Sequence, residues 1–365
     1  MSRKRTRTRT RKDRTRKRRG RRAPKTLPDF QRVFPDEAAC RKYLWNHRFP
    51  NGWICPYCGD DHDPYTFDNR PAVFRCRACK RDTSLTANTV MHRSKQPICL
   101  WFWAAYLVTS LTPGMSAVQF AKMLGIKRYE TAFNMLHKLR AAMVRPGRDV
   151  IGGDYAVEVD ETLVGGATQG EGKGVHHKTL VAGAVEVMPR TDIKWTGRDP
   201  SIPRGDHRGG HGRGVVAGRI RLQVVPDRKQ VTLVRFVQQN VAPGAVVRTD
   251  GWIGYTPLPS VGYRHDPVAV RGDHAKTDVH LPMCHLVFSN LDAWLLGTYH
   301  GVSPKHLQAY LNEYTFRFNR RFWPMVAFDS VLGIVGGGDS PGPVRAPTYR
   351  ELYAGSWEHP GGVGG

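Results

Sequence analysis

Apolar and polar residues alternate along Tyr155-Ala156-Val157-Glu158-Val159-Asp160-Glu161-Thr162-Leu163-Val164. A period of two is typical of a β-strand with one face toward a core. The elements that follow are predicted as strands at 179–187 and 219–225, a helix at 231–241, strands at 245–250 and from 263, and helices at 285–296 and 305–320. Three strands, a helix, a strand and further helices is the order of a ribonuclease-H-like mixed sheet. We therefore expect an α/β domain of this kind over residues 148–328.

Two aspartates lie in this predicted sheet, Asp160 in the middle of the first strand and Asp250 at the end of the apolar one. A carboxylate there is costly to bury without a cation or a hydrogen-bond network. A cap or a turn explains either aspartate alone, whereas both together favour a site for hard divalent cations that act in phosphoryl displacement. By strand alternation Glu158 shares the face of Asp160 and Glu161 does not. Glu158 either supports the site or lies at a solvated edge.

Two cysteine pairs, Cys55-Pro-Tyr-Cys58 and Cys76-Arg-Ala-Cys79, precede the sheet. Four thiolates at this spacing are typical of a closed structural Zn²⁺ site, because soft sulfur ligands select zinc. The sequence predicts a zinc-ribbon domain over 26–95, with His62 at the surface rather than among the ligands. The other three cysteines are interpreted as ordinary buried thiols: Cys40, Cys99 and Cys284.

The chain of 365 residues carries 56 Lys and Arg against 31 Asp and Glu, a net charge of +25. Such an excess favours a polyanionic partner, DNA or RNA ahead of an anionic membrane. No apolar run approaches the roughly 20 residues of a membrane span, and the N-terminus lacks the apolar stretch of a secretory signal. We expect a prokaryotic cytoplasmic, nucleoid-associated protein without a membrane partner.

Helices are predicted over 96–147 in the form of a helix-turn-helix, with Ser116 as a cap and Gly125 in the turn. A plain helical hairpin is the alternative. The basic side chains that this region offers to DNA are Lys127, Arg128, Lys138 and Arg140.

Three segments have compositions that do not build a core. Residues 1–25 are a Lys/Arg/Thr run, predicted as a disordered arm that neutralises phosphates, with a plain solvated tail as the alternative. Residues 188–214 are rich in Gly, Pro, Arg and His and are predicted as a mobile basic insertion. Residues 329–365 are predicted as a flexible Gly/Pro-rich tail.

Long motifs resemble one family of proteins. The cysteine pairs, the strand around Val157-Glu158-Val159-Asp160-Glu161, the run Arg248-Thr249-Asp250-Gly251-Trp252 and the segment 287–321 are together similar to the IS1595 (ISXO2-like) insertion-sequence transposases, over about 30 to 325. This resemblance implies a DDE-type enzyme whose ribonuclease-H-like domain binds two Mg²⁺ ions. It also implies binding to terminal inverted repeats and target DNA, hydrolysis of a phosphodiester and strand transfer.

Carried over by motif, the first two catalytic residues are Asp160 and Asp250, and the third is His285, where many relatives have Glu. A neutral imidazole suits Mn²⁺ better than Mg²⁺. Asn290 is the rival for this third position, and a helix histidine with a purely structural role is the alternative for His285. Seven residues beyond the third position relatives usually have Lys, whereas this chain has Asp292.

A negative charge at Asp292 would repel the DNA backbone, so either a nearby base replaces the lysine or this copy is weakened. The resemblance implies that a basic helix follows the DNA with Lys305, His306, Arg317, Asn319, Arg320 and Arg321. It also implies a homodimer or a larger synaptic assembly.

Two other functions stay open at this point. One is a non-catalytic DNA-binding relic or repressor derived from a transposase, which Asp292 favours. The other is a metal-dependent nuclease that cuts without strand transfer.

Overall fold

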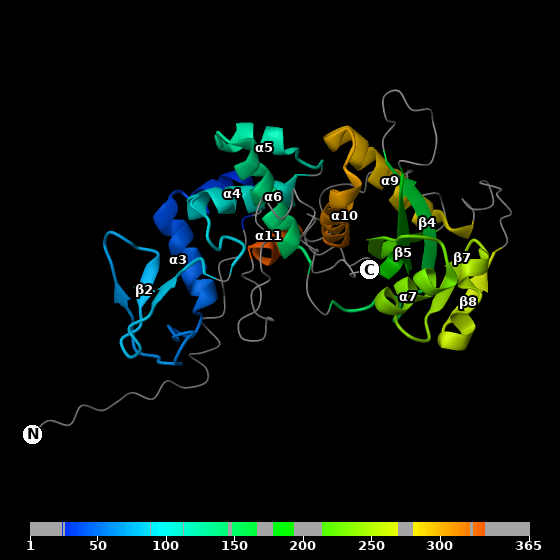
Figure 1. Ribbon diagram of the computed structural model, residues 1–365, viewed down its shortest axis with the longest axis horizontal. Coiled ribbons are helices and arrows are strands. Elements are labelled where there is room, and N and C mark those ends of the chain that lie inside the picture. Colours follow the sequence, from blue (N-terminus) through cyan, green and yellow to red (C-terminus); the bar gives the residue numbers. More distant parts are fainter. Residues whose placement is uncertain are drawn as a thin grey trace, which may run out of the picture.

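The structure is a computed structural model of the chain. It describes residues 24, 26–87, 89–111, 113–144, 148–165, 178–192, 214–268, 280–321 and 324–332. Most of the predicted arm, of the predicted insertion and of the predicted tail lies outside these residues. Figure 1 shows two bodies, one built from the ribbon and helices of the N-terminal half and one around a sheet.

The sheet has five strands in the order β6-β5-β4-β7-β8. Their bounds are β4 Val157–Val164, β5 Thr179–Pro189, β6 Val215–Val224, β7 Val246–Thr249 and β8 Arg264–Pro267. Strands β4, β5 and β6 pair antiparallel, and β7 joins β4 and β8 in parallel. This mixed sheet confirms the predicted ribonuclease-H-like α/β fold, and β4 lies at its centre.

Helices cover both faces of the sheet. One face packs on α7 (Gln230–Asn240) and on two short turns, η3 (Ile253–Tyr255) and η4 (Leu258–Val261). The other packs on α9 (Pro282–Tyr299) and α10 (Pro304–Asn319). Alternation along β4 decides which of its residues face each layer of helices. Val157 and Val159 face α7 and belong to the core on that side. None of the described helices combines the length and the apolar character needed to cross a membrane.

The N-terminal body is a single core rather than two separate units. Its elements are α2 Leu27–Val33, α3 Glu37–Arg48, β1 Tyr65–Thr66, β2 Val73–Arg75, β3 Asp82–Ser84, α4 Ile98–Ser110, α5 Ala117–Leu124 and α6 Tyr129–Ala142. Buried residues of the ribbon, among them Trp53 and Phe74, belong to the same cluster as Trp101 and Phe102 of α4. The ribbon and the helices that follow it therefore support each other.

The chain returns to this N-terminal body at its far end. Helix α11 (Pro324–Val331) lies beside α4 and α6 in Figure 1. Phe328 packs against Phe30, Phe34 and Phe102, with ring centroids between 5.8 and 6.1 Å apart. The ordered fold thus continues past residue 329, where the flexible tail was predicted to begin. Residues 329–332 therefore belong to the fold, and the rest of the predicted tail lies outside the described residues.

Candidate functional site

Asp160 lies in β4 opposite Gly183 of β5, and it is 8% exposed. Its carboxylate accepts a hydrogen bond of 2.8 Å from the N–H of Glu161. Burial raises the pKa of Asp160 to about 7, and the charges of Glu161 and Asp250 act in the same direction. The ionised form of this carboxyl is therefore costly in the protein unless a positive charge, such as a bound cation, compensates it.

His285 lies on α9 directly across from this strand. Its Nε2 is 3.8 Å from Oδ2 of Asp160. Ligands around a divalent ion with bonds of about 2.1 Å lie roughly 3 to 4 Å apart, so one ion can bind both atoms. Asn290 is five residues further along and exposed, whereas Asp292, two turns along, is on the same side of α9 as His285. Position therefore favours His285 over Asn290 as a partner of Asp160.

Asp250 follows β7, the parallel neighbour of β4. Glu158 pairs with Arg248 in that register, which sets Asp250 at the level of Asp160. Its Oδ1 accepts a hydrogen bond of 2.9 Å from the N–H of Trp252. Among described residues, the groups of three or more ligand atoms within 4.8 Å of one another do not include these three side chains. Asp250 is thus close to Asp160 without completing a tight cluster.

Glu158, two residues before Asp160, is 1% exposed. Its Oε2 accepts hydrogen bonds from the N–H groups of Met283 (2.7 Å) and Cys284 (2.9 Å) at the start of α9. The solvated edge considered for Glu158 is therefore wrong. The structure joins it to the helix that carries His285.

Glu161 points to the opposite face of β4, as alternation predicts. It receives a hydrogen bond from the hydroxyl of Tyr255 and pairs with Arg228, whose Nε is 2.6 Å from Oε2. The guanidinium of Arg228 also lies 5.2 Å from the Trp252 ring, and the indole N–H of Trp252 donates to the Arg228 carbonyl. This group links β4 to the loop that carries Asp250. Sequence patterns gave no signal for Arg228 or Tyr255 beyond the position of their partner Glu161 next to Asp160.

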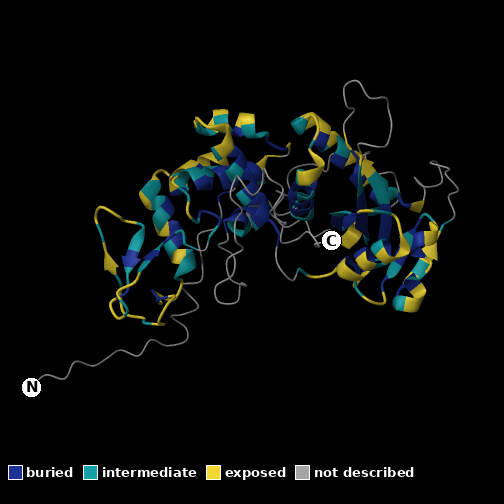
Figure 2. Cartoon of the chain, in the orientation of Figure 1, coloured by how far each residue is buried: buried dark blue, intermediate teal, exposed yellow. Residues whose placement is uncertain are grey.

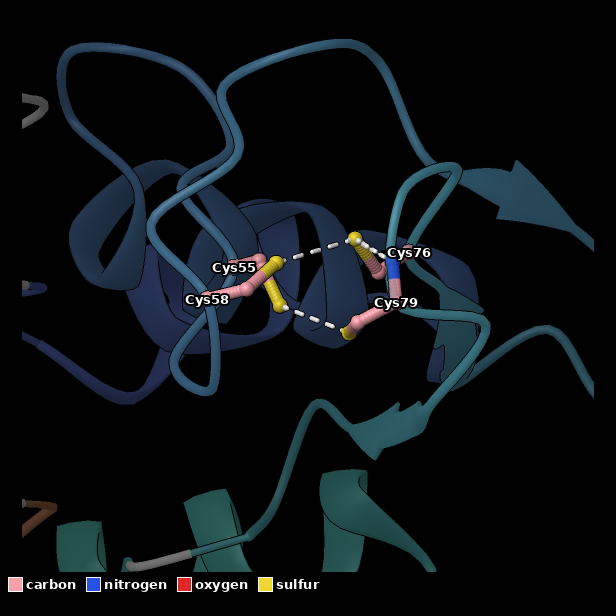
Figure 3. A group of neighbouring side chains, drawn as sticks. All are labelled: Cys55, Cys58, Cys76 and Cys79. Atoms are coloured by element: carbon pink, nitrogen blue, oxygen red, sulfur yellow. Dashed lines mark hydrogen bonds between the residues drawn. The ribbon is translucent and has the colours of Figure 1, made fainter.

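The four cysteines converge in the N-terminal body, as Figure 3 shows. The sulfur atoms of Cys55 and Cys79 are 3.7 Å apart, and those of Cys58 and Cys76 are 3.6 Å apart. A tetrahedral Zn²⁺ with Zn–S bonds of about 2.3 Å requires sulfurs about 3.8 Å apart. The cysteines therefore fit a closed structural zinc site. His62 is exposed and binds Asp60, which agrees with its prediction as a surface residue.

Comparison with protein families identifies both bodies. Residues 151–319 match the ISXO2-like transposase domain, and residues 35–82 match the transposase zinc-ribbon domain of the same group. Together these matches span more than half of the chain and contain all seven predicted metal ligands. The chain belongs to the IS1595 transposase family. No curated protein and no solved structure matches it.

Helices α5 and α6 form the region predicted as a helix-turn-helix, and within α6 the exposed residues lie at its N-terminal end. Lys127 and Arg128 are exposed in the turn before α6. Most of α6 is buried, as Figure 2 shows, so it cannot enter a DNA groove along its length. Lys138 is half-buried, with Nζ 2.9 Å from the His92 carbonyl. Arg140 is 2% exposed and pairs with Glu313, so its prediction as a DNA contact is wrong.

Most of the side chains at α10 that were predicted to contact DNA make contacts with other parts of the protein. Asn319 bonds the backbone N–H and carbonyl of Ile220 at 2.8 and 3.1 Å. Arg317 pairs with Glu313 and donates to the Pro113 carbonyl (3.0 Å). The remaining members lie as follows: Arg320 stacks on Phe316, Arg321 stacks on Phe318, His306 packs near His137, and Lys305 is exposed. Asn319 and Arg317 thus fasten α10 to β6 and to the segment after α4, and their contact with DNA stays a prediction.

Proposed function

We propose that this IS1595 transposase binds the terminal inverted repeats of an insertion sequence and catalyses metal-dependent hydrolysis and strand transfer. One observation carries the proposal: Asp160 and His285 face each other at 3.8 Å between β4 and α9 of the family's transposase domain. Asp250, at the end of the neighbouring strand, supplies the second carboxylate.

In this proposal Asp160, Asp250 and His285 hold Mg²⁺ or Mn²⁺. Bound divalent ions would stabilise the negative charge on the attacking and leaving oxygens of an in-line displacement. Asp160 is supplied by the rigid centre of the sheet, and His285 by a helix packed on it. Water then attacks a phosphodiester at the end of the element and frees a 3′-hydroxyl, which attacks the target DNA.

Recognition of the DNA ends falls to the N-terminal body in this proposal. Lys127 and Arg128 lie at the N-terminal end of α6, the part of a recognition helix that contacts base edges in helix-turn-helix proteins. The zinc ribbon and the basic arm 1–25 would add contacts to phosphates. Two ends must be brought together, so we propose that two or more copies act in one synapse.

The test is strand transfer in vitro with the full-length protein, a pre-cut duplex ending in the flanking inverted repeat and a supercoiled target. Wild-type protein should give joined product in Mg²⁺ or Mn²⁺. Asp250→Ala should give none. Asp266→Ala is a matched control, because Asp266 lies on the next strand and pairs with Arg248 (3.3 Å) away from Asp160. Loss of product in both variants would contradict the assignment of Asp250.

A second function is favoured by Asp292, which puts a negative charge on the side of α9 that carries His285. A non-catalytic DNA-binding protein would bind the inverted repeats and give no product with either metal. Cleavage without joining would instead identify a nuclease. Either result would replace the proposed strand transfer.

A further inference from the structure

We propose that Glu158 is the positioning residue for His285: its buried carboxylate fixes the start of α9 against β4 and so places the imidazole opposite Asp160. This inference rests on the proposed metal site. It assigns no contact with DNA or metal to Glu158 itself.

Glu158 accepts hydrogen bonds from the first backbone N–H groups of α9. Pro282 is the first residue of the helix and has no N–H. The next two N–H groups, of Met283 and Cys284, both donate to Oε2 of Glu158. His285 is the first residue of α9 whose N–H donates to a backbone carbonyl four residues earlier, that of Leu281, at 3.1 Å. Glu158 thus caps the helix immediately before the residue that faces Asp160.

Helix α9 has no cap of its own. The residue before it, Leu281, makes no side-chain hydrogen bond to the helix. A carboxylate at a helix N-terminus is stabilised by the N–H groups and by the helix dipole, and charge-assisted bonds of this kind are about twice as strong as neutral ones. This stabilisation comes from Glu158 on β4, so it also fixes the position of α9 relative to that strand.

The geometry of β4 links the contact between Glu158 and the start of α9 to the contact between Asp160 and His285. Glu158 and Asp160 are two residues apart and point to the same face of β4. Residues 283–285 are consecutive on α9, so the two elements meet at two adjacent points, Glu158 with the helix start and Asp160 with His285. A shift of α9 along β4 that broke the first contact would also move His285 away from Asp160.

Two other glutamates serve as matched controls. Glu37 accepts the N–H groups of Ile98 (2.9 Å) and Cys99 (2.8 Å) and caps α4 in the N-terminal body in the same way. Glu186 is buried on β5 and accepts the N–H groups of Gly152 and Arg219, both at 2.9 Å. Glu37 reproduces the capping and Glu186 reproduces the burial, while neither contacts α9.

The test measures Mn²⁺ binding to zinc-loaded, full-length protein by electron paramagnetic resonance of the free ion. Glu158→Gln should weaken binding by about tenfold to a hundredfold, the effect usual for residues that orient a metal ligand. Glu37→Gln and Glu186→Gln should leave it unchanged. In a His285→Ala background, Glu158→Gln should cause no further loss, because it acts through the imidazole. Glu158→Asp, which keeps the charge on a shorter side chain, enters the same cycle if the Gln variant does not fold.

Several results would overturn the inference: unchanged binding in Glu158→Gln, an equal loss in either control, or an additional loss in the His285→Ala background. Absence of any Mn²⁺ binding that depends on Asp250 would overturn it too. If that binding and the cycle behave as expected while strand transfer fails, the proposed function is wrong and the role of Glu158 stands.

Discussion

Arg140 of α6 and Glu313 of α10 form an ion pair of 2.8 Å in which both side chains are almost fully buried. Arg140 also lies 4.0 Å from the Tyr310 ring. Arg317 binds Glu313 from the next turn of α10. This cluster joins the N-terminal body to the transposase domain.

Arg140→Met should destabilise the protein by about 3 kcal/mol or more, because it leaves a buried carboxylate without its main partner. Arg140→Met/Glu313→Leu should recover a large part of that loss, since both charges are then removed. Urea unfolding at one pH measures the three free energies of unfolding. Arg128→Met, at an exposed site, should change stability by no more than about 0.5 kcal/mol. A double variant as unstable as the single one would contradict this account.

Removal of zinc should unfold the ribbon and loosen the helices packed on it, because Trp53 and Phe74 share a core with α4. Hydrogen exchange measured by mass spectrometry should show lost protection in residues 53–85 and 98–110 after chelation. Strands β4 and β5 should keep theirs. Cys58→Ser should reproduce the effect and Cys99→Ser should not; protection that stays intact in the ribbon without zinc would refute a structural role for the metal.

Asp160 should make the folding stability of the protein depend on pH and on added Mn²⁺. Burial raises its pKa from 3.8 to about 7, so the metal-free folded state binds this proton more tightly than the unfolded state does. The contribution of Asp160 to stability is then fully present below about pH 4 and is lost as the pH rises through about 7. A divalent ion displaces the proton, so the rise in Tm caused by Mn²⁺ should grow between about pH 5.5 and pH 8. Scanning calorimetry measures this rise, and Asp160→Asn should abolish its growth with pH.

Asp292→Lys should strengthen DNA binding. Asp292 lies two turns beyond His285 on the same side of α9, and burial raises its pKa while nearby Lys178 opposes the shift. A lysine there would add a phosphate contact and steepen the dependence of log K on log salt by about 1. Fluorescence anisotropy with a repeat duplex measures both quantities. Asn290→Lys places a lysine on another face of α9 and changes the net charge by +1, against +2 for Asp292→Lys. A gain from it as large as that from Asp292→Lys would contradict a specific phosphate contact at residue 292.

Local patterns predicted the parts of the protein that depend on neighbours in sequence. The spacing of Cys55, Cys58, Cys76 and Cys79 predicted the ribbon, and alternation predicted β4 with Glu158 and Asp160 on one face. Long-range partners were beyond such patterns. Glu158 caps a helix through Met283, 125 residues away, and Arg140 pairs with a carboxylate 173 residues away. The positive charge of Arg140 in the predicted helix-turn-helix therefore looked available to DNA although the fold buries it.

The return of α11 to the N-terminal body has a consequence at the level of the gene. The family matches end at Asn319, and every metal ligand proposed above precedes that residue. A stop codon just after α10 would spare all of them and still remove Phe328 from the aromatic core around Phe30 and Phe34. Loss of the codons from residue 320 onward would thus expose the core of the N-terminal body, which holds the four cysteines. An insertion sequence with such a stop codon could therefore be silenced although every proposed metal ligand is still encoded.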